Sequence, residues 1–129
     1  MSPADFISRA IGLPWVKWRS DWQACDCYGL VLLWWREVHG IDLGTVPQAD
    51  IDQGFAGIKG WQECGPEPNA TGFMAWRNGA PTHCGVLVQC GMLLHVDGSE
   101  AKPGTARLTS LVAMQRLYAD IRFYRPAPC

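Results

Sequence analysis

The stretch Asp26-Cys27-Tyr28-Gly29-Leu30-Val31 decides the fold, because it opens the most regular helical pattern in the chain. From Cys27 onward, apolar residues recur at i, i+3, i+4, i+7 and i+11, which is one face of a helix. These residues are Cys27, Leu30, Val31, Trp34 and Val38. Asp26 is a suitable N-cap, and Gly40 suits the position that follows the last turn. The pattern therefore predicts a thiol in the first turn of a helix, at the positive end of its dipole.

The helix dipole alone is too weak to make this thiol a nucleophile. In exposed settings it contributes about 0.3–1 kcal/mol, which is less than one pKa unit at about 1.4 kcal/mol per unit. The neighbouring carboxylate of Asp26 acts in the opposite direction. Cys27 therefore needs a basic partner elsewhere in the chain.

A predicted hairpin supplies that partner. Residues 84–88 and 92–96 are predicted to form two strands joined by Gln89-Cys90-Gly91, with Gly91 in the left-handed conformation. A three-residue loop places Val88 opposite Met92. The face that carries Cys84, Val86, Val88, Met92, Leu94 and Val96 is then wholly apolar and is predicted to be core.

The other face of this hairpin carries two imidazoles. In the same register Gly85 lies opposite His95, and His83 lies opposite Asp97. His83 and His95 are then diagonal neighbours, at a typical backbone spacing of about 7–8 Å, and Gly85 leaves room beside His95. A loop one residue longer would break this shared face.

These positions predict a cysteine hydrolase. Cys27 attacks a carbonyl, and His83 takes the thiol proton and later gives it to the leaving amine. His95 hydrogen-bonds His83 and sets its tautomer, with Asp97 as the alternative orienting residue. Other interpretations stay open: a cysteine at a helix start is often a small buried hydrophobe, Cys25 is an alternative reactive thiol, and Cys25 and Cys27 together form a C-x-C that could bind metal.

The remaining pattern predicts an α+β protein with helices first and antiparallel strands afterwards, in one domain over residues 1–129. We expect helices over 3–12, with Ser2 as cap, and over 108–118. We expect a loop over 13–26, strands over 73–77 and 121–124, and a turn at Pro103-Gly104. Residues 41–71 are predicted to be loop, with a short helix near 48–57.

Composition narrows the function classes. The chain has 129 residues, 48% hydrophobic and 18% charged, with a net charge of −1. This charge gives no electrostatic case for nucleic acid or an anionic membrane surface, and the apolar run from Leu30 to Trp35 is too short to span a bilayer. The start of the chain has no signal-peptide pattern, so we expect cytoplasmic synthesis. The six cysteines are then expected to remain thiols, and their spacing predicts no metal or other cofactor.

At these residues the sequence resembles the NlpC/P60 family of papain-like cysteine peptidases. The nucleophile motif of that family, D-C-[SWY]-G-[LF]-V, corresponds to residues 26–31, and its histidine motif corresponds to residues 83–88 followed by 92–95. Leu13-Pro14-Trp15 and residues 72–76 resemble two further family segments. The closing Phe123-Tyr124-Arg125-Pro126 is similar to the ends of small phage-tail and gene-transfer-agent members.

The resemblance implies a papain-like fold with the nucleophile helix packed on an antiparallel sheet. It implies cleavage of peptidoglycan stem peptides by a Cys27–His83–His95 triad, carried by a phage-like tail with other tail proteins as partners. Asp26 would contact the substrate amine, and Tyr28 and Trp15 would line the substrate site. Tyr28 stands where serine is commoner and Trp15 where a tyrosine hydroxyl often assists, and we expect no wall-binding domain beside the catalytic one.

Three rival hypotheses follow from these departures and from the cysteine content. One is a structural tail-tip subunit with this fold and little or no catalysis. Another is a cysteine-rich metal-binding module. The third is a papain-like amidase or acyltransferase.

Overall fold

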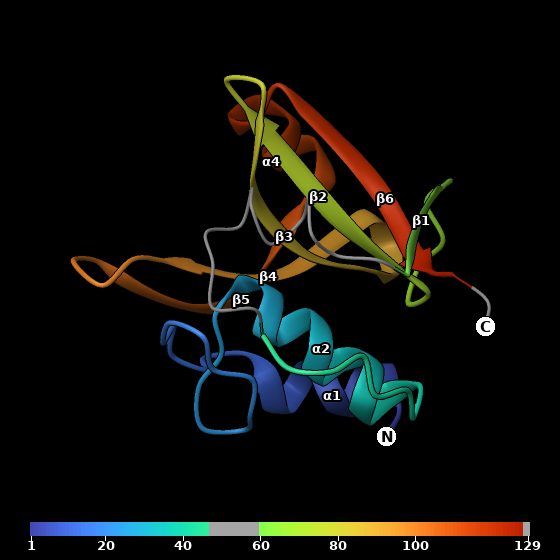
Figure 1. Cartoon of the computed structure of the whole chain (residues 1–129), viewed down its shortest axis with the longest axis vertical. Helices are drawn as coiled ribbons and strands as arrows, with labels where there is room; N and C mark the ends of the chain where they lie inside the picture. The colour runs from blue at the N-terminus through green and yellow to red at the C-terminus, as the bar shows by residue number, and fades with distance from the viewer. Residues whose placement is uncertain (47–59, 128–129) are drawn as a thin grey trace.

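The chain folds as helices packed on both faces of one antiparallel sheet (Figure 1). The computed structural model describes residues 1–46 and 60–127. Within these residues the helices are α1 (Pro3–Ala10), α2 (Cys27–Val38) and α4 (Leu111–Leu117), with one 3₁₀ turn at Gln89–Gly91. The strands are β1 (Trp61–Cys64), β2 (Thr71–Arg77), β3 (Ala80–Val88), β4 (Met92–Gly98), β5 (Pro103–Ser110) and β6 (Asp120–Pro126). Their order across the sheet is β1-β6-β2-β3-β4-β5, so the predicted α+β class is confirmed.

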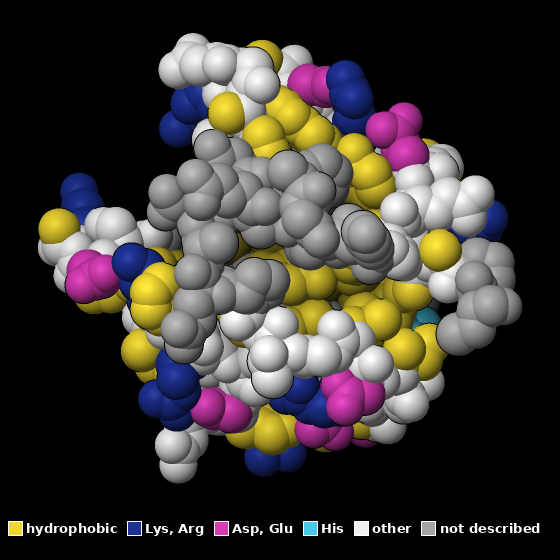
Figure 2. All heavy atoms as spheres, in the orientation of Figure 1, with side chains coloured by type: hydrophobic (Ala, Val, Ile, Leu, Met, Phe, Trp, Pro, Cys, Tyr) yellow, Lys and Arg dark blue, Asp and Glu magenta, His cyan; other side chains and the backbone are white. Residues whose placement is uncertain are grey.

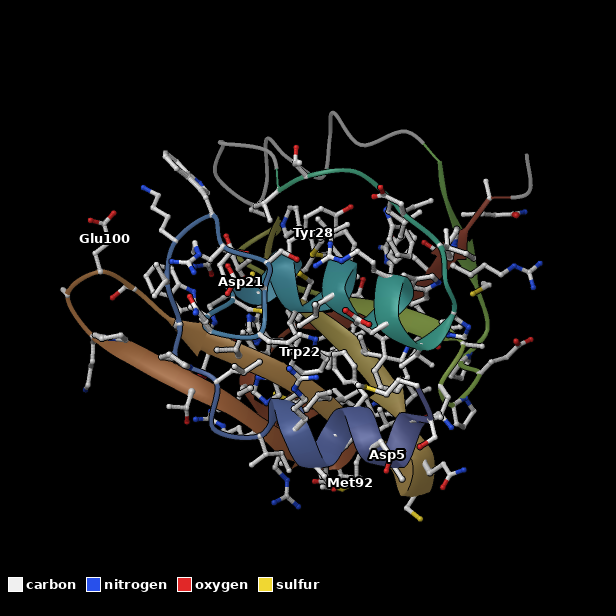
Figure 3. The ribbon with its side chains drawn as sticks, turned by 90° about the horizontal axis from the view of Figure 1, so that it is seen from below. Asp5, Asp21, Trp22, Tyr28, Met92 and Glu100 are labelled. Atoms are coloured by element: carbon white, nitrogen blue, oxygen red, sulfur yellow. The ribbon has the colours of Figure 1, made fainter. Side chains whose placement is uncertain are left out.

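Both N-terminal helices begin where their caps predict. Ser2 accepts a hydrogen bond from the Asp5 amide at the start of α1, and Asp26 accepts one from the Gly29 amide at the start of α2. α1 ends at Ala10, two residues earlier than predicted. The predicted apolar stripe on α2 is too narrow, because every residue from Gly29 to Trp35 is buried. The sheet covers one side of α2, and α1 with the loop before α2 covers much of the rest (Figures 1 and 3).

The sheet separates two apolar clusters because successive strand residues point to opposite faces. The cluster on the α1–α2 face includes Met74, Cys84, Val86 and Leu94. The smaller cluster on the other face is formed by Phe73, Ala75, Leu87, Leu93 and Met114, the last from α4. The apolar face predicted for the hairpin is therefore the one that α2 covers.

The predicted hairpin register is confirmed for the three pairs next to the turn, and the predicted pairs Gly85–His95 and His83–Asp97 are not among the β3–β4 partners. Val88 pairs with Met92, Leu87 with Leu93 and Val86 with Leu94. Gly91 has the predicted positive φ, 65°, and Cys90 shares this conformation at 62°. Toward its N-terminal end β3 pairs with β2, where His83 lies opposite Ala75. Figure 1 shows β4 and β5 diverging from β2 and β3 at that end of the hairpin.

Three sequence predictions are wrong. Pro103-Gly104 is the first part of β5 and not a turn, and residues 108–110 continue that strand, so α4 spans only 111–117. β5 is an edge strand, where a proline at the first position is tolerated. The sequence predicts a loop at β1, which forms by pairing with β6, 59 to 65 positions away in the chain. The helix predicted near 48–57 lies outside the described residues.

Candidate active site

The Cys27 thiol lies at the start of α2, where His83 and Cys84 of β3 meet it. Hydrogen bonds with the Cys84 side chain, with His83 and with the Cys84 backbone lower the pKa of Cys27 well below its ordinary value, although burial opposes the shift. The same contact and burial raise the pKa of the Cys84 thiol. Of the two thiols, Cys27 is the one that interacts with His83, which favours Cys27 as the thiolate of this pair.

His83 is held by a second histidine, as the hairpin register predicts. Its Nε2 lies 2.9 Å from Nδ1 of His95, and the two rings are perpendicular with centroids 5.0 Å apart. Because this contact uses Nε2 of His83, Nδ1 is the ring nitrogen that remains for the interaction with Cys27. His95 continues the chain, because its Nε2 lies 2.8 Å from Oγ1 of Thr109 on β5.

Aromatic rings enclose the two imidazoles. Tyr118, directly after α4, stacks on His83 with ring centroids 6.1 Å apart, and Phe73 contacts both histidines edge-on. His83 and His95 are consequently only 5% and 1% exposed. Burial, and then the proximity of His83, lower the pKa of His95 to about 4, so His95 is neutral at pH 7.

Gly85 permits this packing, as the sequence suggested. An added Cβ at Gly85 would lie 2.6 Å from the Phe73 ring and 2.9 Å from the Cβ of His95, and closer still to the Leu94 carbonyl. A side chain at position 85 would therefore displace His95 or separate β3 from β4.

Asp26 acts on the backbone around the thiol. Its Oδ1 accepts from the Gly29 amide at 2.7 Å, and its Oδ2 accepts from the Trp18 amide at 2.8 Å. Asp26 is 8% exposed, and burial raises its pKa to about 6. These bonds fix the loop before α2 against the first helical turn. The contact of Asp26 with a substrate amine stays a prediction.

The other residues expected to line the substrate site, Tyr28 and Trp15, contact different parts of the fold. Tyr28 is on the side of α2 that faces away from α1 (Figure 3), and its hydroxyl accepts a hydrogen bond from Trp61 Nε1 at 3.1 Å. Trp15 packs against the Gly98 position at the end of β4, and its amide bonds to the Gly104 carbonyl. Substrate contacts by these two residues stay predictions.

Asp97, the alternative orienting residue, pairs with Arg107 across β4 and β5 at 2.8 Å. His83 instead pairs with Ala75 in the β2–β3 ladder, and its Nε2 faces His95. Nε2 of His83 therefore contacts His95, whereas Asp97 is paired with Arg107. Cys25, the alternative thiol, is buried, donates to the Asp21 carbonyl, and has its pKa raised to about 12 by burial.

An apolar pocket of about 330 Å³ opens beside the thiol pair. It lies between α2 and the β1, β6 and β2 side of the sheet. Its lining residues are Tyr28, Val31, Trp61, Gly72, Phe73, Met74, Cys84, Gly85 and Tyr124.

The described residues show neither a group of metal ligands nor a membrane-spanning helix. Among residues 1–46 and 60–127, no three His, Cys, Asp or Glu side chains are grouped so as to hold a metal ion. No helix in that part of the chain is long and apolar enough to cross a membrane.

Two features of the site were missed from the sequence. The sequence predicts a helix at Thr109, although polar Thr105, Arg107 and Thr109 alternate with apolar residues, which is a strand signal. Cys84 was assigned to core packing alone, and no local signal shows that it also meets Cys27.

The chain was compared with known proteins. A scan against models of protein families found no match, and a search of the curated proteins found none. Among solved structures the chain is similar to the NlpC/p60 domain of the peptidoglycan hydrolase SagA, with a TM-score of 0.60 and 18% sequence identity. The alignment covers 95% of this chain and 93% of that one. A likeness at this level of identity shows a shared fold.

Proposed function

We propose that this chain is a cysteine peptidase that hydrolyses amide bonds in peptidoglycan stem peptides, acting as part of a phage-like tail. The observation that carries the proposal is a thiol of lowered pKa at a helix start, beside a histidine whose Nε2 is held by a second histidine. The shared fold with an NlpC/p60 domain of a peptidoglycan hydrolase supports this choice of substrate. The similarity of residues 123–126 to the ends of small tail-associated members supports the tail.

The geometry supports a two-step acyl transfer. The Cys27 thiolate attacks the scissile carbonyl, and the proton that Cys27 gave up is held on Nδ1 of His83. The Cys27 amide, at the positive end of α2, would stabilise the developing oxyanion. His83 then protonates the leaving amine, and a water molecule, deprotonated by His83, hydrolyses the thioester.

The test is cleavage of purified peptidoglycan and of synthetic stem peptides, with the products identified by mass spectrometry. The wild-type chain should release peptide fragments, and Cys27→Ala should release none while it keeps its thermal unfolding midpoint. Cys90→Ser is the matched control, because Cys90 is an exposed thiol on the hairpin turn, and this variant should cleave normally.

The alternative function, a structural tail-tip subunit, predicts a different result. The tryptophan at position 15, which brings no hydroxyl, favours this alternative. A wild-type chain that leaves both substrates intact, although its Cys27 is alkylated rapidly at neutral pH, would overturn the peptidase proposal. Particles that carry Cys27→Ala and still penetrate the wall would support the structural role.

A further inference from the structure

Three neighbouring strands place a hydroxyl behind the two histidines. His83 is on β3, His95 on β4 and Thr109 on β5, and their side chains form a chain with contacts of 2.9 and 2.8 Å. His95 pairs directly with Arg107, so Thr109, two residues further along β5, is its diagonal neighbour on the same face of the sheet. This face is opposite to the one that α2 covers.

The protons in such a chain have two possible directions. In the first, His95 donates from Nε2–H to Thr109 Oγ1, and His95 Nδ1 accepts from Nε2–H of His83. Nδ1 of His83 then keeps its lone pair and can take the thiol proton. In the second, Thr109 donates to Nε2 of His95, and His95 donates from Nδ1–H to Nε2 of His83. Nδ1 of His83 then already carries a proton.

The first direction is the one compatible with a thiolate–imidazolium pair. A protonated His83 carries hydrogen on both ring nitrogens, so Nδ1 of His95 must offer it a lone pair. In the second direction two N–H groups would face each other across 2.9 Å. A neutral His95 is required as well, and burial, which lowers its pKa to about 4, maintains it.

We propose that Thr109 is a positioning residue that accepts from His95 Nε2–H, fixes the His95 tautomer, and thereby keeps Nδ1 of His83 free for the Cys27 proton. The effect of Thr109 on catalysis rests on the proposed function. Its structural consequence, the tautomers of His95 and His83, is measurable without any substrate.

The test uses isosteric and conservative variants. Thr109→Val removes the hydroxyl at nearly constant shape, Thr109→Ser keeps it, and Thr105→Val is the control because Thr105 is an exposed threonine of the same strand. Imidazole ¹⁵N NMR of wild type should show protonated Nε2 on His95. In Thr109→Val this tautomer should lose its dominance, and the rate of Cys27 alkylation near neutral pH should fall about tenfold, which is the effect of one lost hydrogen bond.

Peptide hydrolysis adds a third measurement. Thr109→Val should lower kcat about tenfold at unchanged KM, and Thr109→Ser should restore it. A wild-type His95 protonated on Nδ1 would overturn the proposal, and so would a folded Thr109→Val with unaltered tautomers. If the tautomers are as proposed but wild type does not cleave peptidoglycan, the proposed function fails and the role of Thr109 stands.

The apolar pocket carries a second, independent inference about substrate choice. Its walls are α2 on one side and the sheet on the other, where the aromatic side chains are chiefly Trp61 and Tyr124, and it reaches Cys84 beside the nucleophile. Figure 2 shows hydrophobic atoms gathered between the helices and the upper strands, with most of the charged side chains around the periphery.

We infer that this pocket takes an uncharged aliphatic side chain of the substrate next to the scissile amide, which in a stem peptide is an alanine methyl group. None of the described lining residues has a side chain that is charged at pH 7, so a glutamyl carboxylate or a lysyl ammonium group would lose its hydration without gaining an oppositely charged partner. This inference rests on the proposed function for the nature of the substrate.

The test uses peptidyl fluoromethyl ketones that alkylate Cys27 and differ in one side chain. The alanine and leucine probes should react faster than the glutamate and lysine probes, on the order of 100-fold in second-order rate constant. Met74→Glu should reduce this preference; if that variant does not fold, the wild-type ranking alone decides. Equal or faster reaction of the charged probes would overturn the inference. The probes need no peptidoglycan cleavage, so failure of the proposed function remains distinguishable.

Discussion

Replacing Cys84 by alanine should raise the pKa of the Cys27 thiol by about one unit. Cys84 supplies the largest contribution that lowers this pKa, through its side chain, and its backbone adds a smaller one. A hydrogen bond to a charged group contributes about 1.5–3 kcal/mol, and the weakness of S–H as a donor puts Cys84 at the lower end. At about 1.4 kcal/mol per pKa unit, the loss corresponds to about one unit.

The matched variant is Cys84→Ser, which keeps a side-chain donor at the same place. The pH dependence of iodoacetamide alkylation, read by mass spectrometry on the peptide that contains Cys27, measures the pKa directly. Cys25 is on the same peptide, but burial raises its pKa to about 12, so it should remain unlabelled. Below the pKa, Cys84→Ala should react about tenfold more slowly than wild type, and Cys84→Ser should react nearly as fast.

Two results would refute this reasoning. In the first, the profile of Cys84→Ala superimposes on that of wild type in a protein that unfolds at the same temperature. In the second, the serine variant loses as much reactivity as the alanine variant, which would assign the effect to packing and not to the donor.

Further predictions concern the surroundings of the thiol. Burial lowers the pKa of His95 from 6.5 to about 4, so its stabilising contribution, present above pH 6.5, should be lost as the pH falls through 4, by about 3 kcal/mol. Burial raises the pKa of Asp26 from 3.8 to about 6, so its contribution is present below pH 3.8 and lost as the pH rises through 6, which is the opposite sign. In Asp26→Asn the free energy of unfolding, measured with urea, should therefore fall more steeply than in wild type as the pH is lowered from 6.5 to 4. An equal pH dependence in the two proteins would contradict these assignments. Gly85→Ala should destabilise the fold by about 1–3 kcal/mol and lower kcat, because the added Cβ would meet Phe73 and His95. Gly65→Ala, where a Cβ meets open space, should leave the unfolding midpoint unchanged.

The features predicted correctly from the sequence have local causes. Asp26 caps α2 through an amide three residues away, and the three-residue loop of the hairpin fixes the register that brings His83 to His95. Such features depend on a few consecutive residues and on the period of the element. They were therefore predictable without knowledge of the rest of the chain.

The features that were missed depend on distant partners. β1 has only four residues and forms through β6, so its own sequence carries almost no strand signal. The sequence predicts a helix over 108–118, whereas pairing with β4 makes residues 103–110 an edge strand that includes Thr109. Tertiary pairing overrides local preference at such positions.

His83, Cys84 and Gly85 act on Cys27 as one unit, although successive strand residues point to opposite faces of a sheet. His83 belongs to the face with Phe73 and Tyr118, and Cys84 belongs to the face that α2 covers. The Cys27 thiol can contact both residues because this part of β3 pairs with β2 only. The pairs between β3 and β4 begin at Val86. Gly85 then lets the strands come together beside His95. Because all three residues share one nucleophile, their substitutions should be non-additive: once Gly85→Ala has displaced His95, Cys84→Ala should cost less reactivity than it does in the wild-type chain.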